Sequence, residues 1–158
     1  MSADERRAVY LNDHLAGATA GLELFRRAAR AQRGTDRGAE LARLRDEVQE
    51  DRDALVELMH AAGVSVRAYK VLGGWVLEKA GRLKSNGHLL TRSPLSDLVE
   101  LEGMRLGVEG KGCLWRALLA LDDPRLSRAR LERLAARAEA QVGTLEELRL
   151  GAARAVLG

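Results

Sequence analysis

Three residue types that shape many small proteins are scarce in this chain. Its 158 residues include one cysteine, two prolines and five aromatic residues. A lone cysteine excludes a framework of internal disulfides, and the scarcity of aromatics disfavours a β-sandwich or β-barrel. The longest uncharged runs are about nine residues, far short of the roughly 20 that a transmembrane helix needs. No apolar stretch follows the first seven residues, so we expect no secretory signal and a cytoplasmic, all-α protein.

The chain is rich in Leu, Ala and Arg, and its apolar residues recur with the 3.6-residue period of an α-helix. This pattern predicts a single helical domain over residues 1–158, with four long helices over residues 4–31, 37–62, 94–121 and 124–156. Gly63 is a typical helix terminator, and Ser93-Pro94 is a typical helix start. Asp122-Asp123-Pro124 predicts a sharp turn directly before the last helix.

The connection between the second and third long helices, residues 63–92, is too long for a plain loop. We call it the crossover segment, and its helical pattern predicts an extra helix over residues 65–84. It contains six basic residues and one acidic residue, a net charge of +5. Five of these cations are candidate anion-binding residues: Arg67, Lys70, Arg82, Lys84 and Arg92. Such a patch suits nucleic acid, a phosphate-bearing partner or an acidic protein face, or else it covers the acidic first half of the chain.

A shift of 90 residues brings the two halves of the chain into register. Leu41 and Leu44 then align with Leu131 and Leu134. Many other core positions align with the same single offset, so the sequence predicts a duplicated helical hairpin.

Two hairpins joined by a long crossover form a known bundle topology, in which the second and third helices run parallel. On the second predicted helix, the stretch Gln49-Glu50-Asp51-Arg52-Asp53-Ala54-Leu55 is similar to a Glu-Glu-x-x-His-x-Leu motif. Together these features resemble the ferritin-like superfamily. That resemblance implies a di-iron or di-manganese site, with one Glu from each of two helices and a Glu-x-x-His pair from each of the others.

Most of the positions that would hold those metal ligands contain other residue types here. The two single-Glu positions and the two His positions correspond to Ala18, Val108, Ala54 and Thr144. Asp51 is the only carboxylate left, because Gln141 stands at its counterpart on the last helix. One carboxylate and one amide do not make a di-metal site, so we expect no bound metal and no cofactor.

An alternative follows if the helices are rotated from the phase assumed above. In that case Glu23, Glu50, Asp53, Glu102 and Glu139 would turn inward. The chain would then be a di-iron or di-manganese oxidase, a peroxidase or an iron-storage protein with unusual ligands. The literal Glu57-x-x-His60 pattern lies opposite the apolar line of its helix, so we interpret it as part of a solvated face.

Several polar residues nevertheless fall on or beside the inward lines of the predicted helices. They are His14, Asp51, Arg105, Lys111 and Gln141. They would bind a small anion or polar ligand, or they would form a polar layer that fixes helix register. The arginines of the last helix, Arg137 among them, are interpreted as a solvated face. The sequence therefore favours a non-catalytic binding or structural module that forms a homo-oligomer.

Overall fold

The computed structural model describes residues 1–67 and 93–158. The regular structure of these two ranges consists of α1 (Ala3–Ala31), α2 (Asp36–Ala61), α4 (Pro94–Leu121) and α5 (Arg128–Leu157), with no strand among them. The all-α prediction is therefore confirmed. The predicted bounds of the first three long helices agree with the structure to within one residue.

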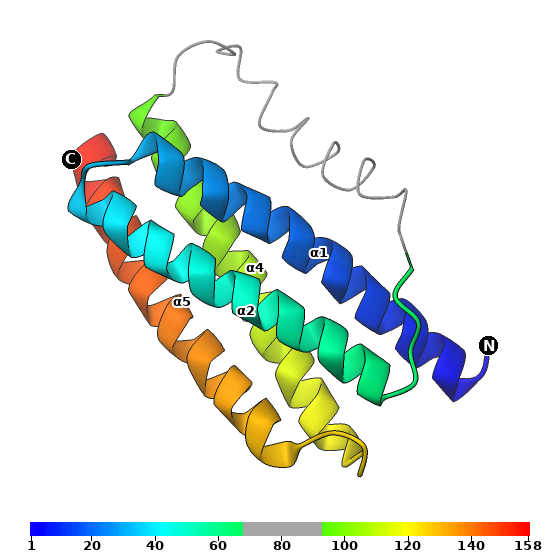
Figure 1. The fold of residues 1–158 in the computed structure, drawn as a ribbon. Helices are drawn as coiled ribbons and strands as arrows, with labels where there is room; N and C mark the ends of the chain where they lie inside the picture. The colour runs from blue at the N-terminus through cyan, green and yellow to red at the C-terminus, as the bar shows by residue number, and fades with distance from the viewer. Residues whose placement is uncertain (68–92) are drawn as a thin grey trace.

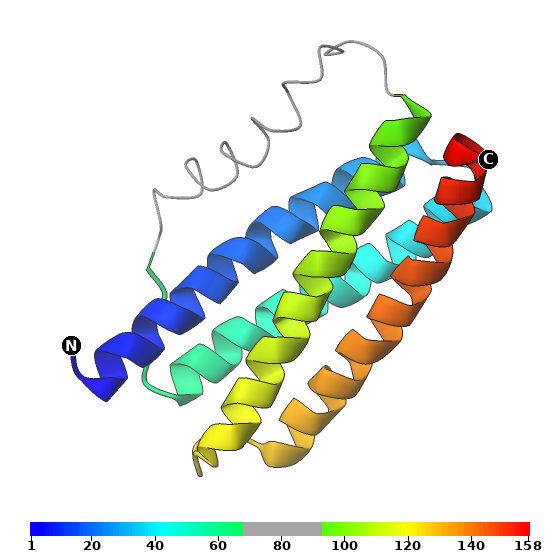
Figure 2. The same cartoon turned by 180° about the vertical axis from the view of Figure 1, so that it is seen from behind.

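The four helices pack side by side as two antiparallel hairpins, α1 with α2 and α4 with α5 (Figures 1 and 2). Helix α1 also lies against α4, and α2 lies against α5 in the loosest of these four neighbouring pairs. Helices α2 and α4 run in the same direction. At 1.5 Å per residue, the 28 residues of α4 make a rod of about 42 Å.

Local signals in the sequence explain where the helices begin. Ser2 caps α1 through a reciprocal pair of hydrogen bonds with Glu5. Thr35 caps α2 by accepting a hydrogen bond from the Gly38 amide. A Cβ atom at Gly38 would collide with the Gln32 carbonyl oxygen, so this glycine permits the tight turn between α1 and α2.

The end of α2 depends on a second glycine. Gly63 adopts a φ of +73°, which is unfavourable for other residues. The Val64 amide donates to the Met59 carbonyl at 2.8 Å, and the Gly63 amide donates to the His60 carbonyl at 3.0 Å. This pair of bonds is a Schellman motif, and it turns the chain out of the bundle at the predicted place.

The last helix begins four residues later than predicted, at Arg128 instead of Pro124. The Leu126 amide donates to the Asp123 carbonyl at 2.9 Å, which closes a turn around Pro124. Ser127 then caps the helix by accepting from the Arg130 amide at 3.3 Å. The prediction missed this because Pro124 suits the first position of a helix and the second position of a turn equally well.

The predicted helix over residues 65–84 is contradicted at its start, because residues 65–67 are not helical. The buried side chain of Asn12 holds this backbone instead. Its amide nitrogen donates to the Ser65 carbonyl at 3.2 Å, and its oxygen accepts from the Arg67 amide at 2.8 Å. The rest of that predicted helix lies outside the described residues.

The core is a layer of apolar side chains contributed by all four helices. Its largest fully buried members are Leu11, Phe25, Leu41, Leu44, Leu55, Met59, Leu101, Met104, Leu114, Trp115, Leu131 and Leu145. Within this layer, three polar residues of the described part of the chain are also buried: Asn12, Asp51 and Gln141. Asn12 belongs to the anchor described above, and the other two form the centre of the candidate site.

Candidate functional site

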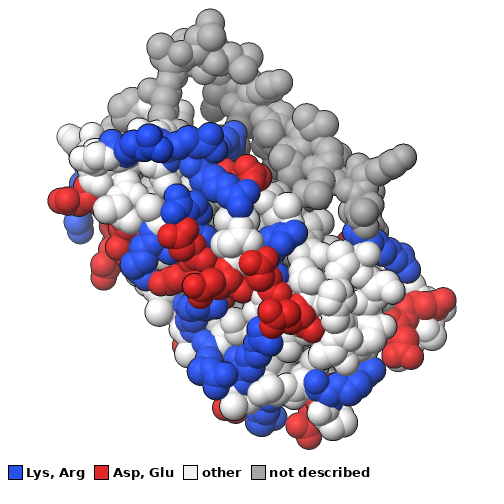
Figure 3. Space-filling model, in the orientation of Figure 1, with Lys and Arg blue, Asp and Glu red and all other residues white. Residues whose placement is uncertain are grey.

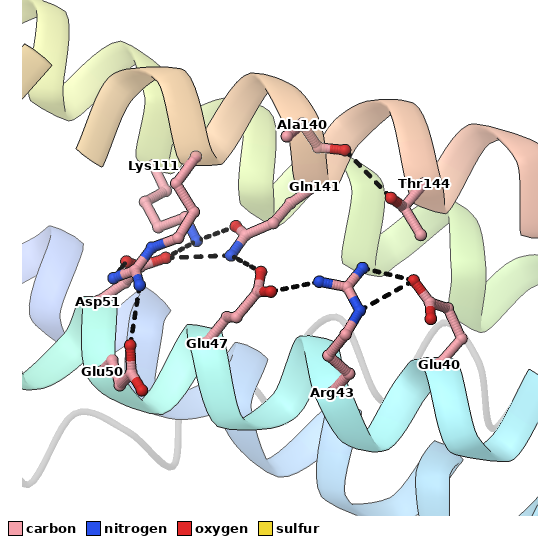
Figure 4. A network of polar contacts seen from close by, with 10 residues as sticks. Glu40, Arg43, Glu47, Glu50, Asp51, Lys111, Ala140, Gln141 and Thr144 are labelled. Carbon is pink, nitrogen blue, oxygen red and sulfur yellow. Dashed lines mark hydrogen bonds and ion pairs between the residues drawn. The ribbon is translucent and has the colours of Figure 1, made fainter. Parts of the chain in front are cut away.

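Asp51 is the most deeply buried charged residue that the structure describes, with its side chain 0 % exposed. Helix periodicity places it there, because it follows Val48 by three residues and precedes Leu55 by four. A carboxylate that is removed from water needs charged or hydrogen-bonding partners to avoid a large desolvation cost. Figure 4 shows that these partners come from α4 and α5.

Two cations neutralise Asp51 directly. The Lys111 ammonium group on α4 and the Arg137 guanidinium group on α5 each form an ion pair with one of its carboxylate oxygens. The Gln141 amide nitrogen lies 3.4 Å from the carboxylate, and the Gln141 oxygen accepts from Lys111 at 2.5 Å. Gln141 also donates to Glu47 at 2.9 Å. We call Glu47, Asp51, Lys111, Arg137 and Gln141 the polar cluster.

The polar cluster is satisfied by its own members. Lys111 is 12 % exposed at its side chain, and burial lowers the pKa of its ammonium group although Asp51 beside it opposes the shift. Both Asp51 oxygens already accept from cations. A metal ion at Asp51 would have to displace Lys111 or Arg137 and leave that cation buried without a partner.

At the surface, further ion pairs between α2 and α5 extend the polar cluster. Arg137 also bonds to Glu50 at 2.8 Å, and Arg130 reaches Glu57 at 2.5 Å. On α2 itself, Arg43 binds Glu47. Figure 3 shows blue and red side chains alternating along this side of the molecule.

A groove opens between α2 and α5 because these two helices stay further apart than the other neighbours. Its volume is about 460 Å³, and its lining consists of Glu50, Ala54, Arg130, Arg133, Leu134 and Arg137. The two apolar members, Ala54 and Leu134, are each 5 % exposed and form the floor. The groove therefore combines an apolar floor with three arginines on its α5 side and the acidic Glu50 on its α2 side.

Three of the five predicted polar-core residues, Asp51, Lys111 and Gln141, meet in the polar cluster. The other two do not join it. The half-buried ring of His14 packs edge-on against Tyr10, with 4.6 Å between the ring centroids. Burial lowers the pKa of His14, and the nearby Asp13 opposes this shift.

Arg105 is the second residue that the structure places elsewhere. It forms ion pairs with Glu146 at 3.1 Å and with Glu109 at 3.7 Å. Its long side chain reaches from α4 to Glu146 on α5, so it joins the two helices of that hairpin and does not reach the polar cluster.

The sequence analysis missed Arg137 and Glu47 as members of the polar cluster. Arg137 was interpreted as part of a solvated face, but its side chain is only 32 % exposed and reaches the buried Asp51. The available signal was its spacing, because Arg137 precedes Gln141 by four residues and therefore shares its helix face. Glu47 stands in the same relation to Asp51.

The alternative set of metal ligands does not turn inward. Glu23, Glu50, Asp53, Glu102 and Glu139 are all exposed, and each lies beside an arginine. In residues 1–67 and 93–158, no three His, Cys, Asp or Glu side chains are placed to hold a metal ion. The rotation of the helices on which the oxidase, peroxidase and storage alternatives depend is therefore wrong.

Only one of the five candidate anion-binding residues of the crossover segment lies in the described part of the chain. Arg67 is exposed, and its backbone is held by Asn12. Lys70, Arg82, Lys84 and Arg92 lie outside the described residues. Among the described helices, none is both long and apolar enough to cross a membrane.

The chain was compared with models of protein families, with curated proteins and with solved structures. None of the three comparisons produced a match. The geometry of the polar cluster and of the groove beside it is therefore the basis for assigning a function.

Proposed function

We propose that this chain is a ferritin-like helical bundle that has lost the di-metal centre and acts as a non-catalytic binding or structural module. The observation that carries this proposal is the neutralisation of Asp51 by Lys111 and Arg137. In the resemblance, Asp51 stands where a metal-binding Glu would be. Here two side chains of the same chain provide the positive charge that a metal pair would otherwise supply.

The other positions of the implied metal site support the same proposal. Val108 and Ala54 are buried apolar residues, 3 % and 5 % exposed, and neither carries a metal-binding atom in its side chain. Thr144 uses its hydroxyl group to donate to the Ala140 carbonyl of its own helix at 3.2 Å. Ala18 is partly buried. A hard or borderline cation would therefore find too few oxygen or nitrogen donors at the bundle centre.

Metal analysis of the purified chain tests this proposal. The protein is produced in medium supplemented with iron and manganese, and both metals are measured by mass spectrometry. We expect far less than one metal ion per chain. About two irons or two manganese ions per chain would overturn the proposal.

A matched variant makes the test sharper. Lys111→Ala frees one oxygen of Asp51 without adding any ligand, so we expect its metal content to equal that of the unchanged protein. If Lys111→Ala acquired iron or manganese in stoichiometric amount, Lys111 would be blocking a latent site and the proposed loss of the metal centre would be wrong.

Three further expectations stay predictions. Light scattering of the purified chain tests homo-oligomer formation, and fractionation of the producing cells tests the cytoplasmic location. Charge reversal at Arg82 and Lys84, followed by a polyanion binding assay, tests the crossover segment as an anion-binding surface.

A further inference from the structure

The groove between α2 and α5 has one wall made almost entirely by arginines of α5. Arg130, Arg133 and Arg137 line it, and their spacing of three and four residues puts all three on one face of that helix. We call this the arginine groove. Each guanidinium group presents several N–H donors in a planar fork that fits the oxygens of phosphate or carboxylate.

The three arginines differ in how far their charge is already used. Arg137 is anchored by the buried Asp51 and also meets Glu50, and Arg130 meets Glu57. Arg133 forms no ion pair or hydrogen bond with any residue that the structure describes. The groove therefore contains Arg133, whose N–H donors are free, beside Arg137, whose guanidinium group is fixed by the buried Asp51.

The acidic residues at the groove are poor competitors for an incoming anion. The side chains of Glu50 and Glu57 are 68 % and 64 % exposed. Ion pairs that are this exposed contribute little to stability, so water can solvate both carboxylates when a ligand replaces them. Asp51 is different because it is buried: its ion pair fixes one terminal nitrogen of Arg137, and the carboxylate itself does not line the groove.

The floor of the groove gives a second element of recognition. Ala54 and Leu134 are apolar and buried beneath the arginines. A volume of about 460 Å³ lies within the range of small-molecule sites. A ligand that carries an anionic group and a short apolar chain would match both the wall and the floor.

We propose that the arginine groove binds a small organic phosphate, with the phosphate group on Arg133 and Arg137 and the apolar part on Ala54 and Leu134. This inference names a ligand class for the binding module proposed above. The ligand proposal and the proposed loss of the metal centre can fail independently, because the metal measurement does not involve the groove and the ligand measurement does not involve metal.

The test is calorimetric titration of the full chain with hexyl phosphate, with inorganic phosphate and hexanol as comparison ligands. We expect saturable binding of hexyl phosphate, weaker binding of inorganic phosphate and none of hexanol. Equal affinity for hexyl phosphate and inorganic phosphate would contradict the role of the apolar floor. Absence of saturable binding would overturn the proposal.

Two arginine variants provide the matched comparison. Arg133→Gln removes the free donor, and we expect it to weaken hexyl phosphate binding about tenfold or more, since hydrogen bonds to charged groups are strong. Arg154→Gln removes another exposed arginine, which lies in the last turn of α5 and does not line the groove, and should leave the affinity within about twofold. Both residues lack ion pairs among the described residues, so both variants should fold. Equal weakening by the two substitutions would show general charge attraction and overturn the proposal.

Discussion

The two hairpins bury several corresponding positions and differ in the polar residues that lie among them. Leu44 and Leu55 in α2 are buried, as are Leu134 and Leu145 in α5, each 90 residues further along the chain. By the same offset, Asp51 corresponds to Gln141 and Glu47 corresponds to Arg137. Several buried apolar positions are thus shared by the two hairpins, whereas others differ, such as Met59, which corresponds to Arg149.

Because of this difference, two contacts between α2 and α5 join corresponding pairs of positions but differ in their chemistry. Asp51 binds Arg137, and Gln141 binds Glu47. Asp51 and Arg137 correspond to Gln141 and Glu47 at the 90-residue offset. The first contact is therefore the counterpart of the second. One of them is a charged pair and the other is an amide-to-carboxylate hydrogen bond. The comparison shows that the buried carboxylate belongs to the first hairpin, and that its buried counterpart in the second hairpin, Gln141, is uncharged.

The prediction with the largest expected effect compares the stability of two variants, one changed at Asp51 and the other at its counterpart Gln141. Asp51→Ala leaves Lys111 near the core without its carboxylate, so we expect the free energy of unfolding to fall by about 3 kcal/mol or more. Gln141→Ala removes the hydrogen bonds of an uncharged side chain to charged partners and leaves no unpaired buried charge of its own, so it should cost less, about 1.5 to 3 kcal/mol. Urea unfolding followed by circular dichroism measures both. Equal losses would show that Asp51 and Gln141 contribute in the same way.

The second test compares the turns that join the helices of each hairpin. Gly38→Ala places a Cβ atom against the Gln32 carbonyl oxygen, so we expect a loss of about 1 to 3 kcal/mol as the backbone shifts. Its counterpart Arg128 is exposed, and Arg128→Ala should change stability by less than about 0.5 kcal/mol. Thermal unfolding of the two variants checks this. A Gly38→Ala protein as stable as the unchanged chain would disprove the close approach.

The third test uses acid, since only the second turn contains a strongly paired carboxylate. Hydrogen bonds from Arg125, its side chain first and its backbone amide next, hold the pKa of Asp123 well below the ordinary 3.8. The folded state therefore binds fewer protons than the unfolded state near this value. The stabilisation is present above pH 4 and is lost as the pH falls further.

We accordingly expect Asp123→Asn to lose stability at neutral pH and to show a weaker dependence on acid than the unchanged protein. Urea unfolding at a series of pH values measures this. Glu147→Gln, which removes an exposed carboxylate without an ion pair among the described residues, serves as the control and should leave the acid dependence unchanged. An unchanged acid profile in Asp123→Asn would contradict the assigned pairing.

The smallest expected effect concerns His14, whose counterpart is the fully buried Met104. Burial lowers the pKa of His14 below the ordinary 6.5, with Asp13 opposing the shift. The folded state favours the neutral imidazole, so the free energy of unfolding should decrease as the pH falls below about 6.5. His14→Met should remove this dependence. A titration by nuclear magnetic resonance that places the His14 pKa above 6.5 would contradict the prediction.

The helices were predictable because their ends carry short-range signals. Ser93-Pro94 and Gly63 mark a start and an end that depend only on neighbouring residues. The start of α5 was not predictable in this way, because Pro124 fits both a turn and a helix start. The choice between them is made by contacts of Asp123 that the helical pattern does not contain.

The candidate site was predictable for the residues that helix phase controls. Asp51 and Gln141 lie on the apolar lines of their helices, and the structure buries both. Arg137 was missed and Arg105 was misplaced for one physical reason. A long, flexible arginine side chain can reach several positions from one backbone site, so its phase does not determine its partner.

The polar cluster also decides which hairpins can pair. If a first hairpin met a second copy of itself in the same arrangement, Asp51 would face Glu47, and two carboxylates would be confined together. If two second hairpins met, Arg137 would face Gln141 with no carboxylate to balance its charge. Only the combination of one hairpin of each kind places opposite charges in contact. The charges of the polar cluster thus favour the pairing of the first hairpin with the second over the pairing of either hairpin with a copy of itself.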